Sequence, residues 1–595
     1  IFKIKYPDKN EFIIVLRAII DVNLAKFLIQ DLPLFIGIYK DLFPGINLPP
    51  SDRGELIGQI KTNLAKKNCQ FTDWYMEKII QVYEMILVRH GLMVVGESFC
   101  GKTTAYQTLA ESLSDINANP KARMKEFKTQ YKIMNPKSIT MGQLYGEFDS
   151  VTREWRDGVL AKSFREMANS TSPDRKWIMF DGPVDAVWIE NMNTVLDDNK
   201  KLCLINGEII KMSNTMNLIF ETENLEYASP ATVSRVGMIF FEIICISWKM
   251  FFTSYQNKLK QKLTDEQFEI VVETVDWLIP ACLDFIKTLT HFVATTDIHL
   301  FVNFTQLFSC LIANEEMRSV SRMWFVCTLL FSIPWAMGAT LTGDSKEKFD
   351  IFYRNLILGE EEVGKQYPRP AKFKFTKAQS YPDGLTVFDY FYDKRKSGAW
   401  VTWLDLTDKP PVRPDMKPTE MIVPTNVTTM QTYFINLYLQ NDVPLMFIGP
   451  TGTGKSTIVL NLLLNLPKEK YLPNIINFSA RSSSNITQEM IMTKLDRRRK
   501  GVYGPAMGKK YVIFIDDLNM PQKETYSAQP AVELIRQIID HKHIYDLQTV
   551  TRVDLVDLLW ISAMIPAMNV ITGKTSHPTL ESSLKVHEHL HKKFT

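Results

Sequence analysis

The chain has 595 residues, of which 45% are hydrophobic and 23% are charged, and its formal net charge is only +3. This length exceeds what one hydrophobic core supports, so we expect several domains of ordinary globular composition. The small net charge excludes a strongly basic, nucleic-acid-binding type of protein. The chain begins with Ile1 and shows no signal-peptide pattern, so it looks like a piece of a longer protein.

The cysteines and apolar runs indicate neither an oxidising compartment nor a membrane. Seven cysteines are scattered without a CxxC pair or His partners at metal spacing, so we expect reduced, mostly buried thiols of an intracellular protein. The run 323–343 has no charged residue and is long enough to span a bilayer, which leaves a membrane helix as an alternative. Pro334 lies in its middle, several Ser and Thr interrupt it, and a matching pair of basic flanks is absent, so we prefer a buried helix.

In chain order, residues 1–65 show helical periodicity interrupted by Pro and Gly, which predicts the end of one domain and a connector. A helix over 74–89 and an apolar strand then lead into a P-loop, GxxxxGK(S/T), in its strand–loop–helix context. Its glycines let backbone N–H groups surround phosphates, Lys102 can reach the β- and γ-phosphates, and Thr103 can hold Mg²⁺. The candidate ATP- or ADP-binding residues here are Gly96, Gly101, Lys102, Thr103 and Thr104.

A second complete P-loop follows an apolar strand over 445–448 and precedes a helix-like apolar repeat. Lys455 and Ser456 take the roles argued for Lys102 and Thr103, so the chain repeats a whole nucleotide-binding unit. We call the two candidate sites the N-terminal site and the C-terminal site. The candidate residues of the C-terminal site are Gly449, Gly452, Gly454, Lys455, Ser456 and Thr457.

Each P-loop is followed by an apolar run that ends in an aspartate suited to orient Mg²⁺, Asp181 in the first case and Asp516 in the second. The next residue decides whether water can be activated. Gly182 has no side chain and cannot act as a base, whereas Asp517 is one methylene shorter than Glu and could serve poorly or through a shifted water. We therefore predict that the N-terminal site holds ATP and that the C-terminal site hydrolyses it slowly. A purely structural nucleotide at both sites is the alternative.

These signals divide the chain into units. We expect residues 66–244 to form the large α/β subdomain of an N-terminal P-loop unit and 245–358 to form its helical lid. The Pro- and charge-rich stretch 359–420 resembles a linker into a C-terminal P-loop unit over 421–595. Asn206-Gly207 predicts a β-hairpin inside the first unit.

Two basic features have competing interpretations. Arg235 is the lone basic residue before an apolar strand, where it could reach the γ-phosphate of a neighbouring unit as an arginine finger, although an ordinary surface arginine fits equally well. The basic run 497–500 could be a nuclear signal or a nucleic-acid patch. No aromatic residues alternate with it, so a solvated turn or a contact between units is preferred.

Several longer phrases resemble the heavy chain of dynein and together cover nearly the whole chain. They are IIDVNLAKFLIQDLPLFIGIYKDLFPG, PKSITMGQLYGEFD, WIENMNTVLDDNK, ATVSR, GPTGTGKS, KLDRRRKGVYGP, IDDLNMP and AQPAVELIRQIIDH. The IDDLNMP and LDRRRKG forms are similar to an axonemal dynein of the inner-arm, single-headed type. The resemblance implies P-loop AAA+ modules, each a parallel sheet flanked by helices with a helical lid. Residues 1–65 would end the first module, and the two P-loop units would belong to the second and third.

The resemblance also implies a function. Members of the family form an ATP-driven ring that moves toward microtubule minus ends and bends cilia. The expected location is the cytoplasm and cytoskeleton, in the axoneme of a cilium or flagellum. Expected partners are the other modules, light and intermediate chains, axonemal complexes and, through regions outside this segment, microtubules; neither nucleic acid nor membrane is expected. Arg235 would complete the first module's ATP site, Gly182 agrees with a second module that holds ATP without turnover, and Asp517 agrees with a regulatory third module.

The chain departs from the family pattern near its end. No arginine occurs after Arg552, so the arginine that should complete the N-terminal site is not identifiable. Either Lys574 or Lys585 replaces it, or the site lacks one.

Three rival functions differ in their sequence requirements. A tandem AAA+ remodelling ATPase similar to midasin shares the chemistry but should lack the LDRRRKG and VLDDNK phrases. An ABC-type transporter requires an LSGGQ-like signature between P-loop and aspartate, and neither unit has one. A scaffold with two structural nucleotides stays open because of Gly182 and Asp517.

Overall fold

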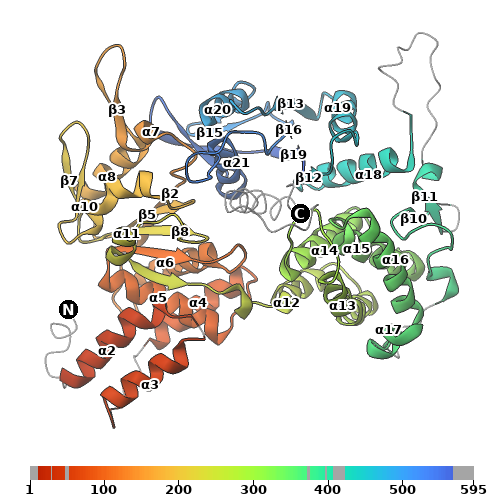
Figure 1. Cartoon of the computed structure of the whole chain (residues 1–595), viewed down its shortest axis with the longest axis horizontal. Coiled ribbons are helices and arrows are strands. Elements are labelled where there is room, and N and C mark those ends of the chain that lie inside the picture. Colours follow the sequence, from red (N-terminus) through yellow and green to blue (C-terminus); the bar gives the residue numbers. More distant parts are fainter. Residues whose placement is uncertain are drawn as a thin grey trace.

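The computed structural model describes residues 11–28, 30–46, 53–370, 376–395, 398–406 and 423–566. In Figure 1 the N-terminal P-loop unit (red to yellow) lies on the left, the lid (green) at the lower right, and the C-terminal P-loop unit (blue) at the top. The C-terminal P-loop unit returns toward the N-terminal one, so that α21 (Pro530–His541) contacts the end of β5 (Arg175–Asp181) and β17 (His543–Asp546) contacts β2 (Thr129–Met134). This return brings segments about 400 residues apart into contact.

The N-terminal P-loop unit is built on a parallel five-stranded sheet in the order β2-β5-β8-β1-β9. Its strands are β1 (Gly91–Val95), β2 (Thr129–Met134), β5 (Arg175–Asp181), β8 (Met216–Thr222) and β9 (Gly237–Phe240). Its helices are α4 (Gly54–Lys66), α5 (Asp73–Val88), α6 (Lys102–Ala118), α7 (Met141–Tyr145), α8 (Val159–Asn169), α9 (Ala186–Ile189), α10 (Asn193–Leu196) and α11 (Pro230–Arg235). The helices α2 (Glu11–Asn23) and α3 (Leu32–Leu42) precede it.

Every residue of β1 and β8 is buried, which explains why the apolar residues of β1 and those at 218–220 of β8 are consecutive rather than alternating. Side chains on one face of the sheet share a core with α4, α5 and α6, and those on the other face share a core with α7 to α10. The parallel strands therefore end together at one edge, where Asp181 of β5 lies in register with Glu221 of β8.

Short hairpins extend from this unit. One is formed by β3 (Gly146–Phe148) and β4 (Trp155–Asp157), the other by β6 (Lys201–Cys203) and β7 (Ile209–Lys211). The second confirms the hairpin predicted at Asn206-Gly207, and Gly207 supplies the positive φ of 88° in its turn.

The lid consists of helices around one large core. They are α12 (Trp248–Leu259), α13 (Asp265–Ile286), α14 (Asp297–Ile312), α15 (Arg322–Gly338), α16 (Gly343–Leu358) and α17 (Glu361–Gln366). The uncharged run 323–343 forms α15 and the start of α16, and α15 is buried from Trp324 to Gly338. Within the described residues, no helix is both long and apolar enough to cross a membrane.

Part of the stretch expected to be a linker is packed into the lid core. The hairpin of β10 (Tyr390–Asp393) and β11 (Ala399–Thr402) contributes Tyr390 and Tyr392, and the adjoining Trp403 is 1% exposed. Aromatic side chains thus continue the lid beyond residue 358, while the domain boundaries given above stay predictions.

The C-terminal P-loop unit has a parallel sheet in the order β12-β19-β16-β13 and a second small sheet in the order β14-β15-β18-β17. Its helices are α18 (Asn426–Gln440), α19 (Lys455–Asn465), α20 (Ser484–Met492) and α21 (Pro530–His541). Its strands are β12 (Leu445–Ile448), β13 (Tyr471–Asn477), β14 (Asp496–Arg499), β15 (Val502–Gly504), β16 (Lys510–Asp516), β17 (His543–Asp546), β18 (Thr551–Leu555) and β19 (Leu558–Met564). The repeated unit inferred from the two P-loops therefore extends to strand order.

Candidate nucleotide sites

The N-terminal site begins with the loop between β1 and α6. Gly101 has a φ of 84°, and a Cβ there would lie 2.8 Å from the Tyr75 ring, so the loop requires glycine. Lys102 Nζ donates to the carbonyl oxygens of Gly96 and Glu97 at 2.6 and 2.8 Å. The lysine thus folds back over the loop, and its ammonium group lies at the concave side where phosphate oxygens would bind.

Two carboxylates complete this side of the N-terminal site. The Thr103 hydroxyl donates to Glu221 Oε1 at 2.5 Å, and Asp181 ends the neighbouring strand. Burial, followed by the nearby charge of Asp181, raises the pKa of Glu221. Glu221 Oε2 is buried and accepts no hydrogen bond from a described residue. A hydroxyl and two carboxylates, one of which has an unpaired oxygen, fit a Mg²⁺ ion with its waters, because Mg²⁺ prefers such oxygen ligands.

A cleft joins these residues to the C-terminal P-loop unit. From the N-terminal P-loop unit it is lined by Lys102, Asp181, Gly182 and Glu221, among others. From the C-terminal P-loop unit it is lined by Tyr526, Ser527, Ala528, Glu533 and Arg536. The candidate site therefore lies between two units, and neither unit encloses it alone.

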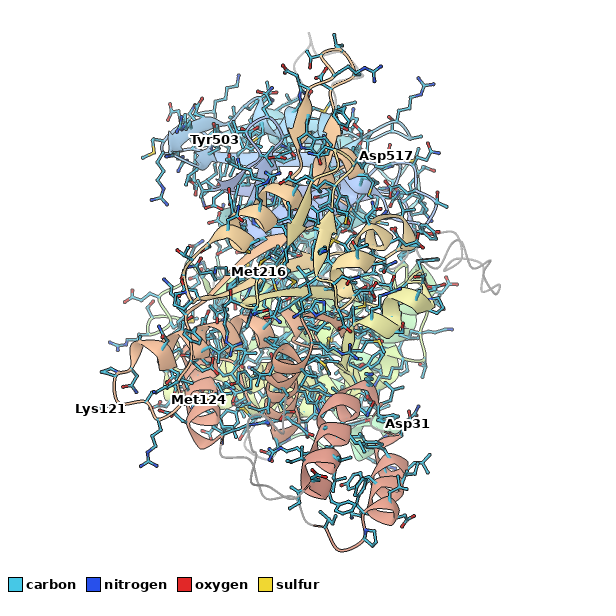
Figure 2. All side chains as sticks on the ribbon, turned by 90° about the vertical axis from the view of Figure 1, so that its left-hand side faces the viewer. Asp31, Lys121, Met124, Met216, Tyr503 and Asp517 are labelled. Carbon is cyan, nitrogen blue, oxygen red and sulfur yellow. The ribbon has the colours of Figure 1, made fainter. Side chains whose placement is uncertain are left out.

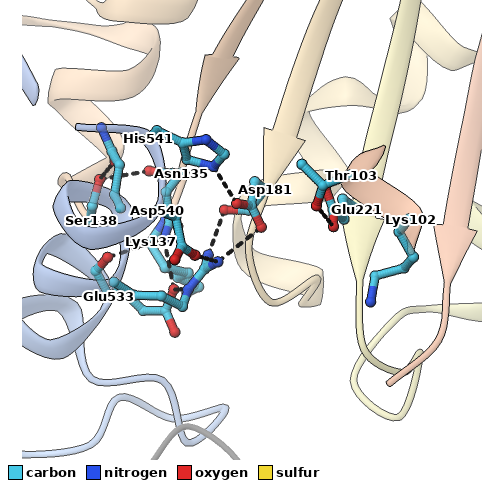
Figure 3. A network of polar contacts seen from close by, with 12 residues as sticks. Lys102, Thr103, Asn135, Lys137, Ser138, Asp181, Glu221, Glu533, Asp540 and His541 are labelled. Carbon is cyan, nitrogen blue, oxygen red and sulfur yellow. Dashed lines mark hydrogen bonds and ion pairs between the residues drawn. The ribbon is translucent and has the colours of Figure 1, made fainter. Parts of the chain in front are cut away.

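The helix α21 contacts Asp181 directly. Arg536 Nη1 donates to Asp181 Oδ1 at 2.9 Å, and Arg536 Nη2 donates to the main-chain oxygen of Asp181 at 2.7 Å. The other carboxylate oxygen, Oδ2, lies 2.6 Å from His541 Nε2. Figure 3 shows Asp181 between His541 and Glu533 on one side and Thr103 and Glu221 on the other.

The rest of the interface fixes the position of α21. Asn135 Nδ2, just after β2, donates to Glu533 Oε2 at 2.6 Å, and the Ser138 hydroxyl donates to Gln537 Oε1 at 2.7 Å. Lys137 forms ion pairs with Asp185 at 2.5 Å and with Glu524 of the C-terminal P-loop unit at 2.8 Å. Burial disfavours the charged amine of Lys137, but these two carboxylates raise its pKa overall.

The C-terminal site repeats the local loop geometry. Gly452 and Gly454 have φ values of 81° and 77°, and Lys455 Nζ donates to the carbonyl oxygens of Gly449 and Pro450 at 2.7 and 2.6 Å. Burial lowers the pKa of Lys455, and the charges of Asp516 and Asp517 oppose this effect.

The acidic end of this site is open. Asp516 is half-buried and Asp517 is exposed with a φ of 53°, and in the described part of the chain neither forms an ion pair with another unit. Figure 2 places Asp517 on the upper, blue part of the molecule, well above Met216 of the first sheet.

The structure brings most predicted site residues together but not all. Both P-loops lie beside their aspartates, whereas Arg235 does not line the cleft and instead pairs with Asp197 of its own unit at 2.5 Å. In the basic run, Arg498 pairs with Asp557 and the other three residues lie at the surface. Lys574 and Lys585 lie outside the described residues.

Arg536 and His541 were missed by sequence reasoning, because the search for a trans-acting cation began only after residue 552. The available signal was the spacing of Glu533, Arg536 and Asp540, which puts three charges on one face of a helix whose opposite face is apolar. Such a face predicts a polar partner across an interface.

Protein-family models of dynein and dynein-related regions match successive parts of the chain. Four family models match: "hydrolytic ATP binding site of dynein motor region" over residues 1–103, "AAA domain (dynein-related subfamily)" over 91–236, "dynein heavy chain AAA lid domain" over 271–405, and "P-loop containing dynein motor region" over 410–574.

Curated relatives agree with these models. Human dynein axonemal heavy chain 3 is 50% identical over 96% of the chain, mouse dynein axonemal heavy chain 12 is 45% identical over 95%, and mouse dynein axonemal heavy chain 1 is 39% identical over 98%. The chain spans 14%, 18% and 14% of the length of these relatives, respectively.

Proposed function

The chain belongs to the dynein heavy-chain family, and from this premise we propose that its two P-loop units are the second and third AAA+ modules of an axonemal motor ring. Residues 1–65 would be the end of the first module. The observation that carries this proposal is the cleft of the N-terminal site, in which one unit supplies the P-loop and the next supplies Arg536. A site shared between neighbours is what a ring of such modules requires.

We assign different roles to the two sites. The N-terminal site binds Mg²⁺ and ATP and holds them, because Gly182 offers no base next to Asp181. Lys102 would bind the phosphates, and Thr103 and Asp181 would hold the metal, which neutralises phosphate charge when bound. The C-terminal site binds ATP through Lys455 and Ser456, holds Mg²⁺ through Asp516, and hydrolyses ATP slowly with Asp517 accepting the proton of the attacking water.

For the whole protein we propose minus-end-directed movement on microtubules in cilia or flagella, with most hydrolysis in the first module. In this assignment Arg235 completes the ATP site of that module. The microtubule-binding region, light and intermediate chains, and other axonemal complexes would act through other parts of the heavy chain.

The test is single-turnover ATP hydrolysis by the intact heavy chain with the P-loop of its first module disabled. We expect slow residual turnover that Lys455→Ala abolishes and Lys102→Ala leaves unchanged. Residual turnover that depends on Lys102 would contradict the division of roles. No turnover in any variant would mean that both sites hold nucleotide only as structure or as a sensor.

A further inference from the structure

The cluster around Arg536 places a buried cation of one unit on the metal-site aspartate of another. Arg536 is 5% exposed, and its guanidinium contacts Asp181 Oδ1 at 2.9 Å, Glu533 Oε2 at 2.9 Å and Asp540 Oδ2 at 3.5 Å. Burial disfavours the charged form, but these carboxylates together hold the pKa of Arg536 above its usual range. The side chain is therefore charged and held in one orientation.

The contacts fix Asp181 as well as Arg536. The guanidinium binds both a carboxylate oxygen and the main-chain oxygen of Asp181, and its planar fork allows the two bonds only in one relative geometry. His541 contacts the remaining carboxylate oxygen from the end of the same helix. Both oxygens of Asp181 are thus oriented by α21, on the side opposite Thr103 and Glu221 (Figure 3).

We propose that Arg536 and His541 are positioning residues for the N-terminal site, supplied in trans by α21, which orient Asp181 for the Mg²⁺ ion of a bound nucleotide. This inference rests on the proposed function, because it assumes that the site binds a Mg²⁺-nucleotide complex. The inference goes beyond the proposed function because it assigns the trans contribution to α21, the helix between strands β16 and β17 of the C-terminal P-loop unit. Groups that orient a metal ligand in this way commonly change metal affinity about 10- to 100-fold.

The connection along the chain gives the contact a consequence. Residues 517–529 lead directly from the end of β16, the acidic end of the C-terminal site, to the start of α21. The Gln529 side chain donates to the main-chain oxygen of Asn519 within this segment at 3.2 Å. This segment therefore sets where α21 begins and, through α21, the position of Arg536 beside Asp181.

The test uses the intact heavy chain with the P-loop lysine of every other module, Lys455 included, replaced by alanine. Binding of a fluorescent ATP and a fluorescent ADP is measured with Mg²⁺ and with EDTA. We expect Arg536→Met to weaken Mg²⁺-dependent binding of both nucleotides about 10- to 100-fold and to leave binding in EDTA unchanged. His541→Asn should act in the same direction with a smaller effect, and Arg499→Met, at an exposed arginine of β14, should have none.

Each other outcome overturns the inference in a recognisable way. Equal losses with Mg²⁺ and with EDTA would show a merely structural interface. A loss for ATP alone that persists in EDTA would show direct contact with the γ-phosphate. Tighter Mg²⁺-dependent binding would show that Arg536 competes with the metal. If Lys102→Ala changes no binding in this background, the proposed function of the site fails as well. If Arg536→Met does not fold, His541→Asn carries the same comparison.

Discussion

The two nucleotide sites have nearly the same P-loop but different surroundings. In both, the lysine donates to two loop carbonyl oxygens and a glycine with positive φ precedes the helix. Asp181 is 9% exposed and is bound by two side chains of the next unit, whereas Asp516 is half-buried and Asp517 is exposed. The P-loop conformation is thus determined by local sequence, whereas the contacts and exposure of the aspartates depend on the neighbouring unit.

This difference gives the residue after each aspartate a different meaning. Gly182 lies against Asn135, which connects the N-terminal site to Glu533 of the neighbouring unit. Asp517 faces solvent within the described part of the chain and has room to contact water. The N-terminal site thus lies between two units, whereas Asp517 at the acidic end of the C-terminal site is exposed.

The largest effect is expected from breaking the interface that distinguishes the two sites. Glu533 is 1% exposed and accepts from both Asn135 and Arg536. Glu533→Ala leaves one donor of the buried Arg536 guanidinium and one of the buried Asn135 amide without its carboxylate partner, while Asp181 and Asp540 still compensate the charge, so we expect a cost of about 1–3 kcal/mol for each donor. We expect faster hydrogen exchange of amides in α21, from which the local opening free energy is obtained.

The matched control is Glu489→Ala, at an exposed glutamate on α20, which should change that free energy by less than about 0.5 kcal/mol. Unchanged exchange in Glu533→Ala would show that α21 is held by its apolar contacts alone. Among the described residues, no side chain of another unit contacts Asp516, so the C-terminal site offers no equivalent change.

The interface beside the N-terminal site should also make stability depend on pH. His543 lies at the interface, with Nε2 3.1 Å from the Ile133 carbonyl oxygen, and burial, followed by the charges of Arg552 and His541, lowers its pKa to about 4. The unfolded chain takes up this proton near pH 6.5, so stability should fall as the pH drops from about 6.5 to about 4, by up to ~3 kcal/mol.

Thermal unfolding of the heavy chain at pH 7 and pH 5 checks this expectation. His543→Gln should reduce the difference between the two pH values, because the substituted side chain does not titrate. An identical pH dependence in the variant would assign the effect to other groups. A drop in pH should weaken contacts inside the C-terminal P-loop unit less than it weakens the interface, because those contacts do not involve His543.

Much of this fold could be predicted from local sequence. The helix expected over 74–89 forms as α5 (Asp73–Val88), and Asp181 and Asp516 end their strands as expected. These features depend on periodicity, turn residues and one motif, all of which are encoded within short windows. The apolar run 323–343 was also predicted correctly as a buried helix, because it contains Pro334 and lacks a matching pair of basic flanks.

The contacts of Asp181 could not be predicted in this way. Arg536 lies 355 residues away along the chain, and its contact depends on how two folded units dock. Sequence position relative to a motif directed the search for this cation to the region after residue 552, but burial and docking decide which cation reaches Asp181. The roles of both sites accordingly stay predictions that binding and turnover must test.

The smallest expected effect concerns the two residues that follow the aspartates. A Cβ at position 182 would lie 2.6 Å from Asn135 Oδ1, which accepts from the Lys137 amide at 2.9 Å. Gly182→Ala should therefore displace the Asn135 side chain and cost about 1 kcal/mol through weakened hydrogen bonds. Asp517→Gly is the matched change at the other site, and since glycine adopts its positive φ freely, it should cost less than about 0.5 kcal/mol.

Urea unfolding of the heavy chain variants measures the free-energy costs of Gly182→Ala and Asp517→Gly. Equal costs would contradict the expected difference between the two sites. The same contact bears on any attempt to install a base at the first site. A glutamate at position 182 would have to displace Asn135 and with it the bond to Glu533. Gain of turnover in Gly182→Glu would therefore require loosening of α21, so hydrolysis and the trans contact on Asp181 should exclude one another there.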